Sequence, residues 1–165
     1  MHSFRERGTM KYTRLTKEQL EELHQEFINF LATQSITAEE WKQLKEEKPK
    51  VAEEEIDVFS DLVWEGVLTQ ATYLENISPQ HMYLFHLHES EMKLIAVKIL
   101  RNDVDITTKE GFQWLRENYT SEEVEILTAN KEYSSDRNAD KFALIQQGSN
   151  ITKGQLYQWF EAMMA

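Results

Sequence analysis

The sequence predicts a mainly helical α+β domain, with six or seven helices packed with a small antiparallel β-hairpin or three-stranded sheet. Three observations predict this class. Helix-capping patterns recur along the chain, apolar residues are spaced as on amphipathic helices, and residues 80–100 alternate as strands do. Five glycines and two prolines in 165 residues also leave little room for the many turns of a β-sandwich.

The capping pattern is a serine or threonine followed three residues later by glutamate or glutamine, so that each side chain satisfies the backbone at the other's position. It precedes apolar periodic runs at Thr16/Gln19, Thr37/Glu40, Thr107/Glu110, Thr120/Glu123 and Thr152/Gln155. Five occurrences together indicate a mostly helical protein.

The first part of the chain predicts three helices. The first, residues 17–33, places its apolar side chains on one stripe, and the second, residues 38–47, carries Trp41. Pro49 suits the first turn of the third helix, which we expect to end at Gly66.

Residues 67–77 fit two interpretations. Their β-branched and aromatic content favours a strand, whereas the spacing of Leu68, Ala71 and Leu74 also suits a helix. We favour the strand, because a lone hairpin is marginal in water and a third strand would support it.

Four helices are expected after the hairpin, over residues 108–118, 121–132, 138–147 and 153–164. The four tryptophans lie on four separate predicted helices, and we expect them to anchor the core: Trp41, Trp64, Trp114 and Trp159.

Residues 80–99, QHMYLFHLHESEMKLIAVKI, contain three of the five histidines. A helix would turn His86 and His88 about 200° apart, whereas a strand places both on one face. The alternation favours an antiparallel hairpin, on which His86 and His88 could supply two ligands to a transition metal. His81 and Glu89 have the opposite parity, so a third ligand has to come from elsewhere. The alternative is an ordinary polar strand face.

Composition excludes several classes of protein. The formal net charge is −11, from 18 basic and 29 acidic residues, so we expect no nucleic-acid partner. The absence of cysteine excludes disulfides, thiol catalysis and cysteine-ligated zinc. The chain has no long apolar run and no secretory signal, so we expect a cytoplasmic protein with no membrane partner. We expect residues 1–9 to be disordered or an upstream extension, and residues 10–165 to form a single globular domain.

Catalytic motifs are missing as well. The sequence has no GxSxG, GxxxxGK[ST], GxGxxG or HExxH pattern, although acid–base chemistry by a pair of carboxylates stays open. We therefore favour a non-enzymatic protein with no catalytic residue and no resident cofactor. The competing hypothesis is a metal-binding protein or metal-dependent enzyme that uses His86 and His88.

The favoured function is a protein-interaction or adaptor role with an unidentified protein partner. The best candidate for the partner surface is the apolar stripe of the C-terminal helix: Leu156, Trp159, Phe160 and Met163. Packing of this stripe on the protein's own core is the alternative. The sequence predicts no oligomeric state.

Three segments carry a resemblance to a known family: MKYTRLTKEQLEELHQEFINFLATQSITAEEW, DVFSDLVWEGVL and LIQQGSNITKGQLYQWFEAM. They resemble an uncharacterised family of small acidic cytoplasmic proteins from Bacteroidetes, over nearly the whole chain from Met10. The resemblance implies a cytoplasmic bacterial protein, and it implies no activity, cofactor or site residue.

Overall fold

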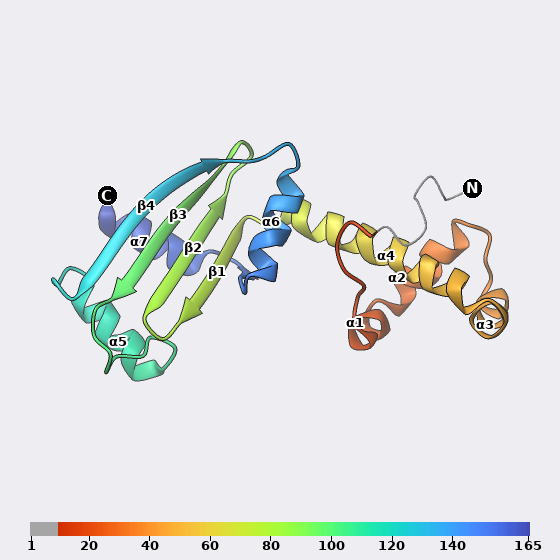
Figure 1. Ribbon diagram of the computed structural model, residues 1–165, viewed down its shortest axis with the longest axis horizontal. Helices are drawn as coiled ribbons and strands as arrows, with labels where there is room; N and C mark the ends of the chain where they lie inside the picture. Colours follow the sequence, from red (N-terminus) through yellow and green to blue (C-terminus); the bar gives the residue numbers. More distant parts are fainter. Residues whose placement is uncertain (1–9) are drawn as a thin grey trace. The chain divides into compact units, whose positions relative to one another are not determined.

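The computed structural model describes residues 10–165, and the expectation for residues 1–9 lies outside the described residues. Within residues 10–165 the chain forms seven helices and five strands (Figure 1). They divide into two compact units, of which the first ends at Val67 and the second is Leu68–Ala165. A single domain over residues 10–165 stays a prediction.

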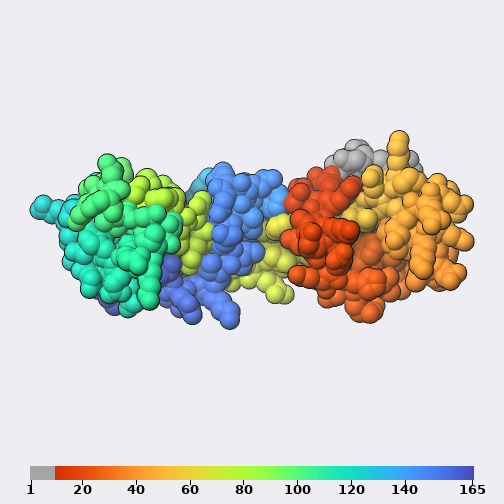
Figure 2. All heavy atoms as spheres, turned by 90° about the horizontal axis from the view of Figure 1, so that it is seen from below, coloured from red at the N-terminus to blue at the C-terminus, as the bar shows by residue number. Residues whose placement is uncertain are grey.

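The first unit is helical. Its elements are α1 (Lys17–Glu22), α2 (His24–Ala32), α3 (Ala38–Glu47) and most of α4 (Pro49–Gln70), and Figure 2 shows the first three in red and orange. Its core consists of Leu15, Phe27, Leu31, Trp41, Ala52 and Phe59. The ring of Phe27 lies edge-on to Trp41, 5.1 Å between centroids, and to Phe59 at 5.0 Å. Trp41 therefore anchors this core, as predicted.

Capping boxes begin two of these helices. Thr16 with Gln19, and Thr37 with Glu40, satisfy each other's backbone as the pattern predicts. The single helix expected over residues 17–33 is instead two helices, α1 and α2. The chain divides at Leu23, because its backbone leaves the helical conformation at φ −99° and ψ 23°.

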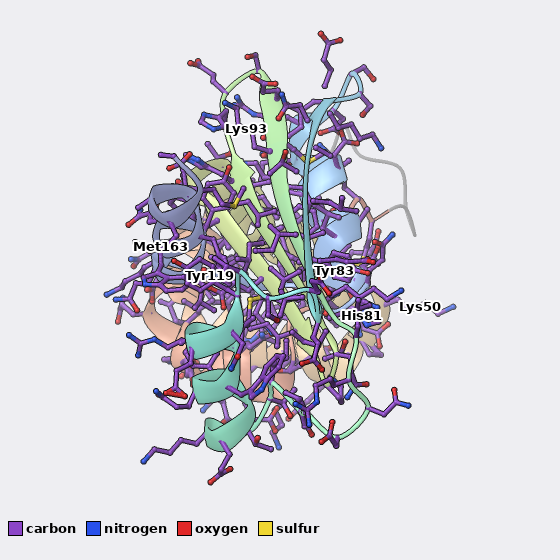
Figure 3. All side chains as sticks on the ribbon, turned by 90° about the vertical axis from the view of Figure 1, so that its left-hand side faces the viewer. Lys50, His81, Tyr83, Lys93, Tyr119 and Met163 are labelled. Atoms are coloured by element: carbon purple, nitrogen blue, oxygen red, sulfur yellow. The ribbon has the colours of Figure 1, made fainter. Side chains whose placement is uncertain are left out.

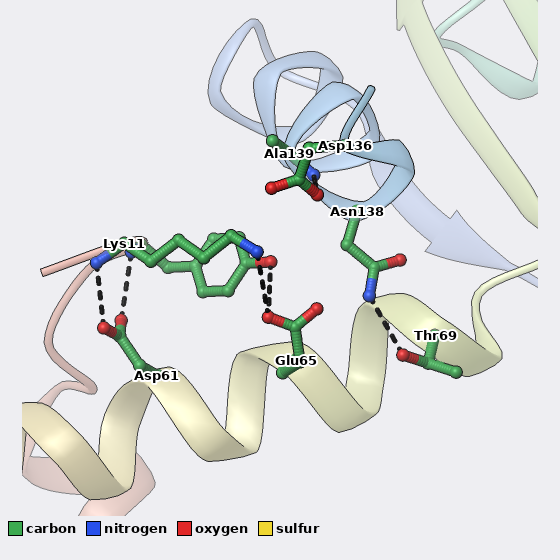
Figure 4. Close-up of polar contacts among 8 residues, drawn as sticks. Lys11, Asp61, Glu65, Thr69, Asp136, Asn138 and Ala139 are labelled. Carbon is green, nitrogen blue, oxygen red and sulfur yellow. Dashed lines mark hydrogen bonds and ion pairs between the residues drawn. The ribbon is translucent and has the colours of Figure 1, made fainter. Parts of the chain in front are cut away.

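Side chains of α4 hold Lys11 and Tyr12 in place, and Figure 4 shows the contacts at Lys11. Both oxygens of Asp61 accept backbone N–H bonds, from Lys11 at 2.8 Å and from Tyr12 at 3.0 Å. The Tyr12 hydroxyl donates to Glu65 at 2.9 Å. Asp61 is only 3% exposed, so these bonds satisfy a buried carboxylate that would otherwise be costly.

The second unit is built on one five-stranded sheet. Its strands are β1 (Tyr73–Ser78), β2 (His81–Leu87), β3 (Glu91–Ile99), β4 (Val124–Glu132) and β5 (Asn150–Thr152). They lie in the order β4-β3-β2-β1-β5, and every neighbouring pair is antiparallel (Figure 1). The predicted β2–β3 hairpin is confirmed, with His81 opposite Lys98 at one end and Leu87 opposite Met92 at the other.

Helices cover both faces of this sheet: α5 (Lys109–Asn118) and α7 (Gln155–Met164) on one, and α6 (Arg137–Gln146) on the other. The larger core cluster joins the sheet to α5 and α7, and it includes Met82, Leu84, Ile95, Val97, Leu115, Tyr157 and Phe160. The smaller cluster lies on the opposite face and includes Leu74, Leu87 and Met92, with Leu144 and Ile145 of α6. Leu84 and Leu87 are three residues apart along β2, so their side chains point to opposite faces of the sheet.

The predicted small hairpin or three-stranded sheet is wrong, although the α+β class is right. Most of residues 121–132, expected as a helix, form the strand β4 (Val124–Glu132), which pairs with β3 along all nine of its residues. In a helix, Val124 and Leu127 would share one face and would be buried together. In the structure Val124 joins the core, whereas Leu127 is 67% exposed. Pairing with β3 therefore outweighs the helical spacing, and the pattern at Thr120 and Glu123 begins no helix.

Smaller differences concern element boundaries. Residues 67–77 contain both structures, because α4 continues to Gln70 and β1 begins at Tyr73. A Cβ at Gly66 would meet no atom within 4 Å, so this glycine is an open helical position and not a helix end. The short strand β5 was not predicted.

No helix within residues 10–165 combines the length and the apolar character needed to cross a membrane.

Candidate functional site

His86 and His88 lie on the same side of the β2–β3 hairpin. His86 belongs to β2, and His88 follows the strand, donating its backbone N–H to Glu91 at 2.9 Å. The two imidazole centroids are 3.8 Å apart, with 42° between the ring planes. His81 lies on the other face, where its ring stacks on Tyr83 at 6.1 Å (Figure 3). The strand brings two of the three histidines together and turns the third away.

Aromatic rings enclose His86. Its imidazole stacks on Tyr73, 4.3 Å between centroids and 17° between planes, and meets Tyr157 edge-on at 5.2 Å. Burial lowers the pKa of His86 and the neighbouring His88 lowers it further, against an opposing effect of Glu161. The neutral imidazole, the form that ligates metals, is therefore favoured.

Two ring nitrogens of this histidine pair lack partners. Nδ1 of His86 and Nε2 of His88 are buried and form no hydrogen bond with any part of the chain that the structure describes. Residues 10–165 contain no group of three or more His, Asp or Glu side chains placed to hold a metal ion. The pair thus offers two protein ligands, fewer than the three of a catalytic zinc site.

A second candidate site, the α5–α7 groove, has a volume of about 230 Å³ and is lined by Phe112, Arg116, Gln155, Leu156 and Trp159. Figure 2 shows α5 at the surface, in green to teal. The Trp159 ring is fixed edge-on against Tyr119 at 5.2 Å and against Phe160 at 4.8 Å. These contacts give the groove a rigid aromatic wall.

The structure separates the four residues predicted to bind a partner. Leu156 and Trp159 line the α5–α7 groove, whereas Phe160 is 1% exposed and belongs to the core. Met163 is 45% exposed and lies on the α7 side of the sheet (Figure 3). The C-terminal helix therefore packs on its own core and still presents part of its stripe to the groove.

Arg116 lines this groove, and two more basic residues lie close in sequence to other residues of its lining. Lys109, Phe112 and Arg116 follow each other at spacings of three and four, so they share one face of α5. Lys153 stands two residues before Gln155. Within residues 10–165, none of these three cations forms an ion pair.

Sequence reasoning missed the α5 half of the groove. The sequence assigns neither Phe112 nor Arg116 to a binding site. Their i, i+4 spacing was an available signal. It could not show that α5 and α7 lie on the same face of the sheet, because that depends on strands β4 and β5, which were not predicted.

These observations define an α+β protein with a helical unit, an antiparallel sheet flanked by helices, and two candidate sites. The chain belongs to DUF6495, a family of unknown function, whose model matches residues 10–165. No curated protein and no solved structure gives a significant match. The function therefore has to be argued from the sites themselves.

Proposed function

We propose that this chain is a non-enzymatic protein-interaction module whose α5–α7 groove binds a segment of a partner protein. One observation carries the proposal. Arg116 lines an apolar groove, Lys109 lies on the same face of α5, and Lys153 stands two residues before Gln155 of the lining. None of the three forms an ion pair among the described residues, in a chain whose net charge is −11.

The lining of the groove favours an apolar anchor on the partner. Phe112, Leu156 and Trp159 supply the hydrophobic surface, and the volume of about 230 Å³ suits a side chain and not a folded domain. Helix-flanked grooves of this kind commonly receive short segments through one or a few anchor residues.

Arg116 in the groove and the basic residues next to its lining in sequence favour carboxylates beside that anchor. Lys109 and Arg116 flank Phe112 on α5, and Lys153 precedes α7. Rim charges of one sign select partners of the opposite sign and accelerate association. Because the chain as a whole is acidic, an acidic segment is repelled elsewhere and attracted here. The proposed ligand is an acidic segment with one aliphatic or aromatic anchor.

Peptide selection on the full chain tests this proposal. Phage-displayed random peptides are selected on the wild-type protein, and a selected peptide is then titrated by fluorescence anisotropy. We expect the selected peptides to carry Asp or Glu beside an apolar residue. Affinity should fall about tenfold, or about 1.4 kcal/mol, in Arg116→Glu. Lys98→Glu, an equal charge change on β3, is the matched control and should bind as the wild type does.

Two results would contradict the groove as the binding site. One is a selection that enriches no peptide above a library passed over an unrelated acidic protein. The other is a selected peptide that binds Arg116→Glu and Lys98→Glu with equal affinity.

The histidine pair supports a second candidate function, binding of a transition metal. The supporting observation is the two buried nitrogens without partners, Nδ1 of His86 and Nε2 of His88. Imidazole suits zinc, copper and nickel. Elemental analysis and metal titration of untagged protein should find one metal per chain. That metal should be lost in His86→Ala/His88→Ala and retained in His81→Ala. Equal metal content in all three proteins would contradict this function.

The proposal includes a location in the bacterial cytoplasm and a protein partner, not a nucleic acid. The absence of cysteine, the net charge of −11 and the resemblance to small acidic proteins from Bacteroidetes support it. Recovery of the chain in a membrane or secreted fraction would contradict the location.

A further inference from the structure

Strand β4 ends the sheet with a long open edge (Figure 1). It has nine residues, against three in β5 at the opposite edge, and residues 127–132 are all exposed. It contains no proline, and it pairs with β3 without a bulge from Val124 opposite Ile99 to Glu132 opposite Glu91. Within residues 10–165, no strand pairs with its outer side. Proteins usually shorten, bend or cover such an edge because it offers unpaired backbone groups to another strand.

The hydrogen-bond pattern fixes which backbone groups face the open edge. Leu100 donates its N–H to the carbonyl of Glu123, so the odd-numbered residues of β4 direct their backbone groups to β3. The even-numbered residues Ile126, Thr128 and Asn130 therefore direct their N–H and C=O groups outward. These groups form a ready ladder for one more antiparallel strand.

We propose that this ladder is filled by β4 of a second copy of the chain, in an antiparallel pair with a two-fold axis at Thr128. Charge complementarity supports this occupant. With Thr128 opposite itself, Glu125 of each copy faces Lys131 of the other, twice in one interface. Neither Glu125 nor Lys131 forms an ion pair within the described part of its own chain.

The same register covers exposed apolar side chains. Leu127, 67% exposed, faces Ala129 of the second copy and joins a cross-strand row with Ala96 and Tyr83. Cross-strand pairs of this kind are the unit of sheet stabilisation.

The α7 face of the sheet also receives side chains of the second copy. A groove of about 300 Å³ runs there beside β4, and Thr128, Asn130, Glu161 and Met164 are among its lining residues. Ile126 of the second copy lies opposite Asn130, on the side where Met164 is 43% exposed.

Other two-fold registers are poorer. An axis at Leu127 pairs only residues 124–130 of β4, and an axis at Ala129 pairs only residues 126–132. Both lose the Glu125–Lys131 pairs, whereas the axis at Thr128 pairs all nine residues. Because the contact is isologous, it closes at two copies and continues the five-stranded sheet into a ten-stranded one.

Sedimentation equilibrium of the full chain and its variants tests this dimer. The wild type should have twice the monomer mass of 19.6 kDa. Lys131→Glu places like charges opposite each other and should weaken the dimer at least about tenfold. Lys131 faces Met92 in its own chain, so this change removes no ion pair within the copy. Glu125 lies opposite Lys98 on β3, so the rescue variant exchanges all three charges. Lys98→Glu/Glu125→Lys/Lys131→Glu restores opposite charges between the copies, keeps opposite charges at positions 98 and 125, and should restore the dimer.

Thr128→Pro provides an independent variant. Its ring removes an N–H that faces the open edge and none that bonds to β3, so the sheet should keep its circular dichroism spectrum while the dimer dissociates. A monomeric wild type would overturn the proposal. A dimer that Lys131→Glu and Thr128→Pro leave equally stable would overturn it as well.

Discussion

The ammonium nitrogen of Lys141 lies 2.8 Å from the carbonyl oxygen of Leu68. It lies at the same distance, 2.8 Å, from the carbonyl oxygen of Ala71. Lys141 is a residue of α6, is only 3% exposed, and caps the C-terminal end of α4, where the helix dipole concentrates negative charge. Burial lowers the pKa of Lys141, and Arg137 lowers it further. A buried cation thus ties α6 to the last turn of α4 within the second unit.

Removing this cation should destabilise the second unit. We expect Lys141→Met to lower the free energy of unfolding by about 2–3 kcal/mol, because two buried carbonyls lose a charged donor. Urea denaturation followed by circular dichroism measures the change. Lys153→Met, at an exposed position, should stay within about 0.5 kcal/mol of the wild type. Equal stability of the two variants would show that the two bonds contribute nothing.

Two glycines should respond in opposite directions to the same substitution. A Cβ on Gly111 would overlap the backbone carbonyl of Asp105, so Gly111→Ala should cost about 2 kcal/mol or more. Gly66 lies in α4 with nothing within 4 Å of its Cβ position, so Gly66→Ala should stabilise by about 0.5–1 kcal/mol. Thermal denaturation of both variants measures the difference. A Gly111→Ala variant as stable as the wild type would refute the close packing of α5 on Asp105.

The lowered pKa of His86 predicts a pH dependence of stability. In the unfolded chain His86 takes up a proton near its ordinary pKa of 6.5, whereas in the folded chain it does so only at lower pH. Its contribution to folding is therefore complete above pH 6.5 and is lost as the pH falls towards the folded pKa. His86→Phe keeps an aromatic ring beside Tyr73 and cannot titrate. Between pH 7 and pH 5, the wild type should lose more stability in urea denaturation than His86→Phe does. Equal losses of stability in the wild type and in His86→Phe would contradict the lowered pKa of His86.

Asp61 and Asp57, both on α4, should differ in how much they contribute to the free energy of unfolding. Asp61 is 3% exposed and accepts two backbone N–H bonds, so Asp61→Ala should cost about 2–3 kcal/mol. Asp57 pairs with the exposed Arg14 at 2.6 Å, and Asp57→Ala should cost less than about 1 kcal/mol. Urea midpoints of both variants make the comparison. A larger loss in Asp57→Ala would mean that the exposed ion pair matters more than the buried carboxylate.

Local signals predicted much of this fold. The Thr16 and Thr37 capping boxes mark the starts of α1 and α3, and strand parity placed His86 and His88 together. These features depend on residues close in sequence, where periodicity and capping chemistry decide the structure.

The rest of the fold depends on long-range pairing. Residues of β4 carry both a helical and a strand pattern, and only the presence of β3 decides between them. β5 has three residues and is a strand only because it pairs with β1. Once β4 was expected as a helix, the faces of the sheet could not be assigned, and the meeting of Phe112 with Leu156 could not be foreseen.

Fluorine NMR of protein labelled with 5-fluorotryptophan tests the proposed groove most directly. The chain has four tryptophans, and Trp159→Phe assigns the signal of the one that lines the α5–α7 groove. Addition of a selected acidic peptide should shift the Trp159 signal and leave those of Trp41 and Trp64, in the first unit, unchanged. A peptide that binds while the Trp159 signal stays in place, or that shifts Trp41 or Trp64 instead, would contradict the groove as the partner-binding site.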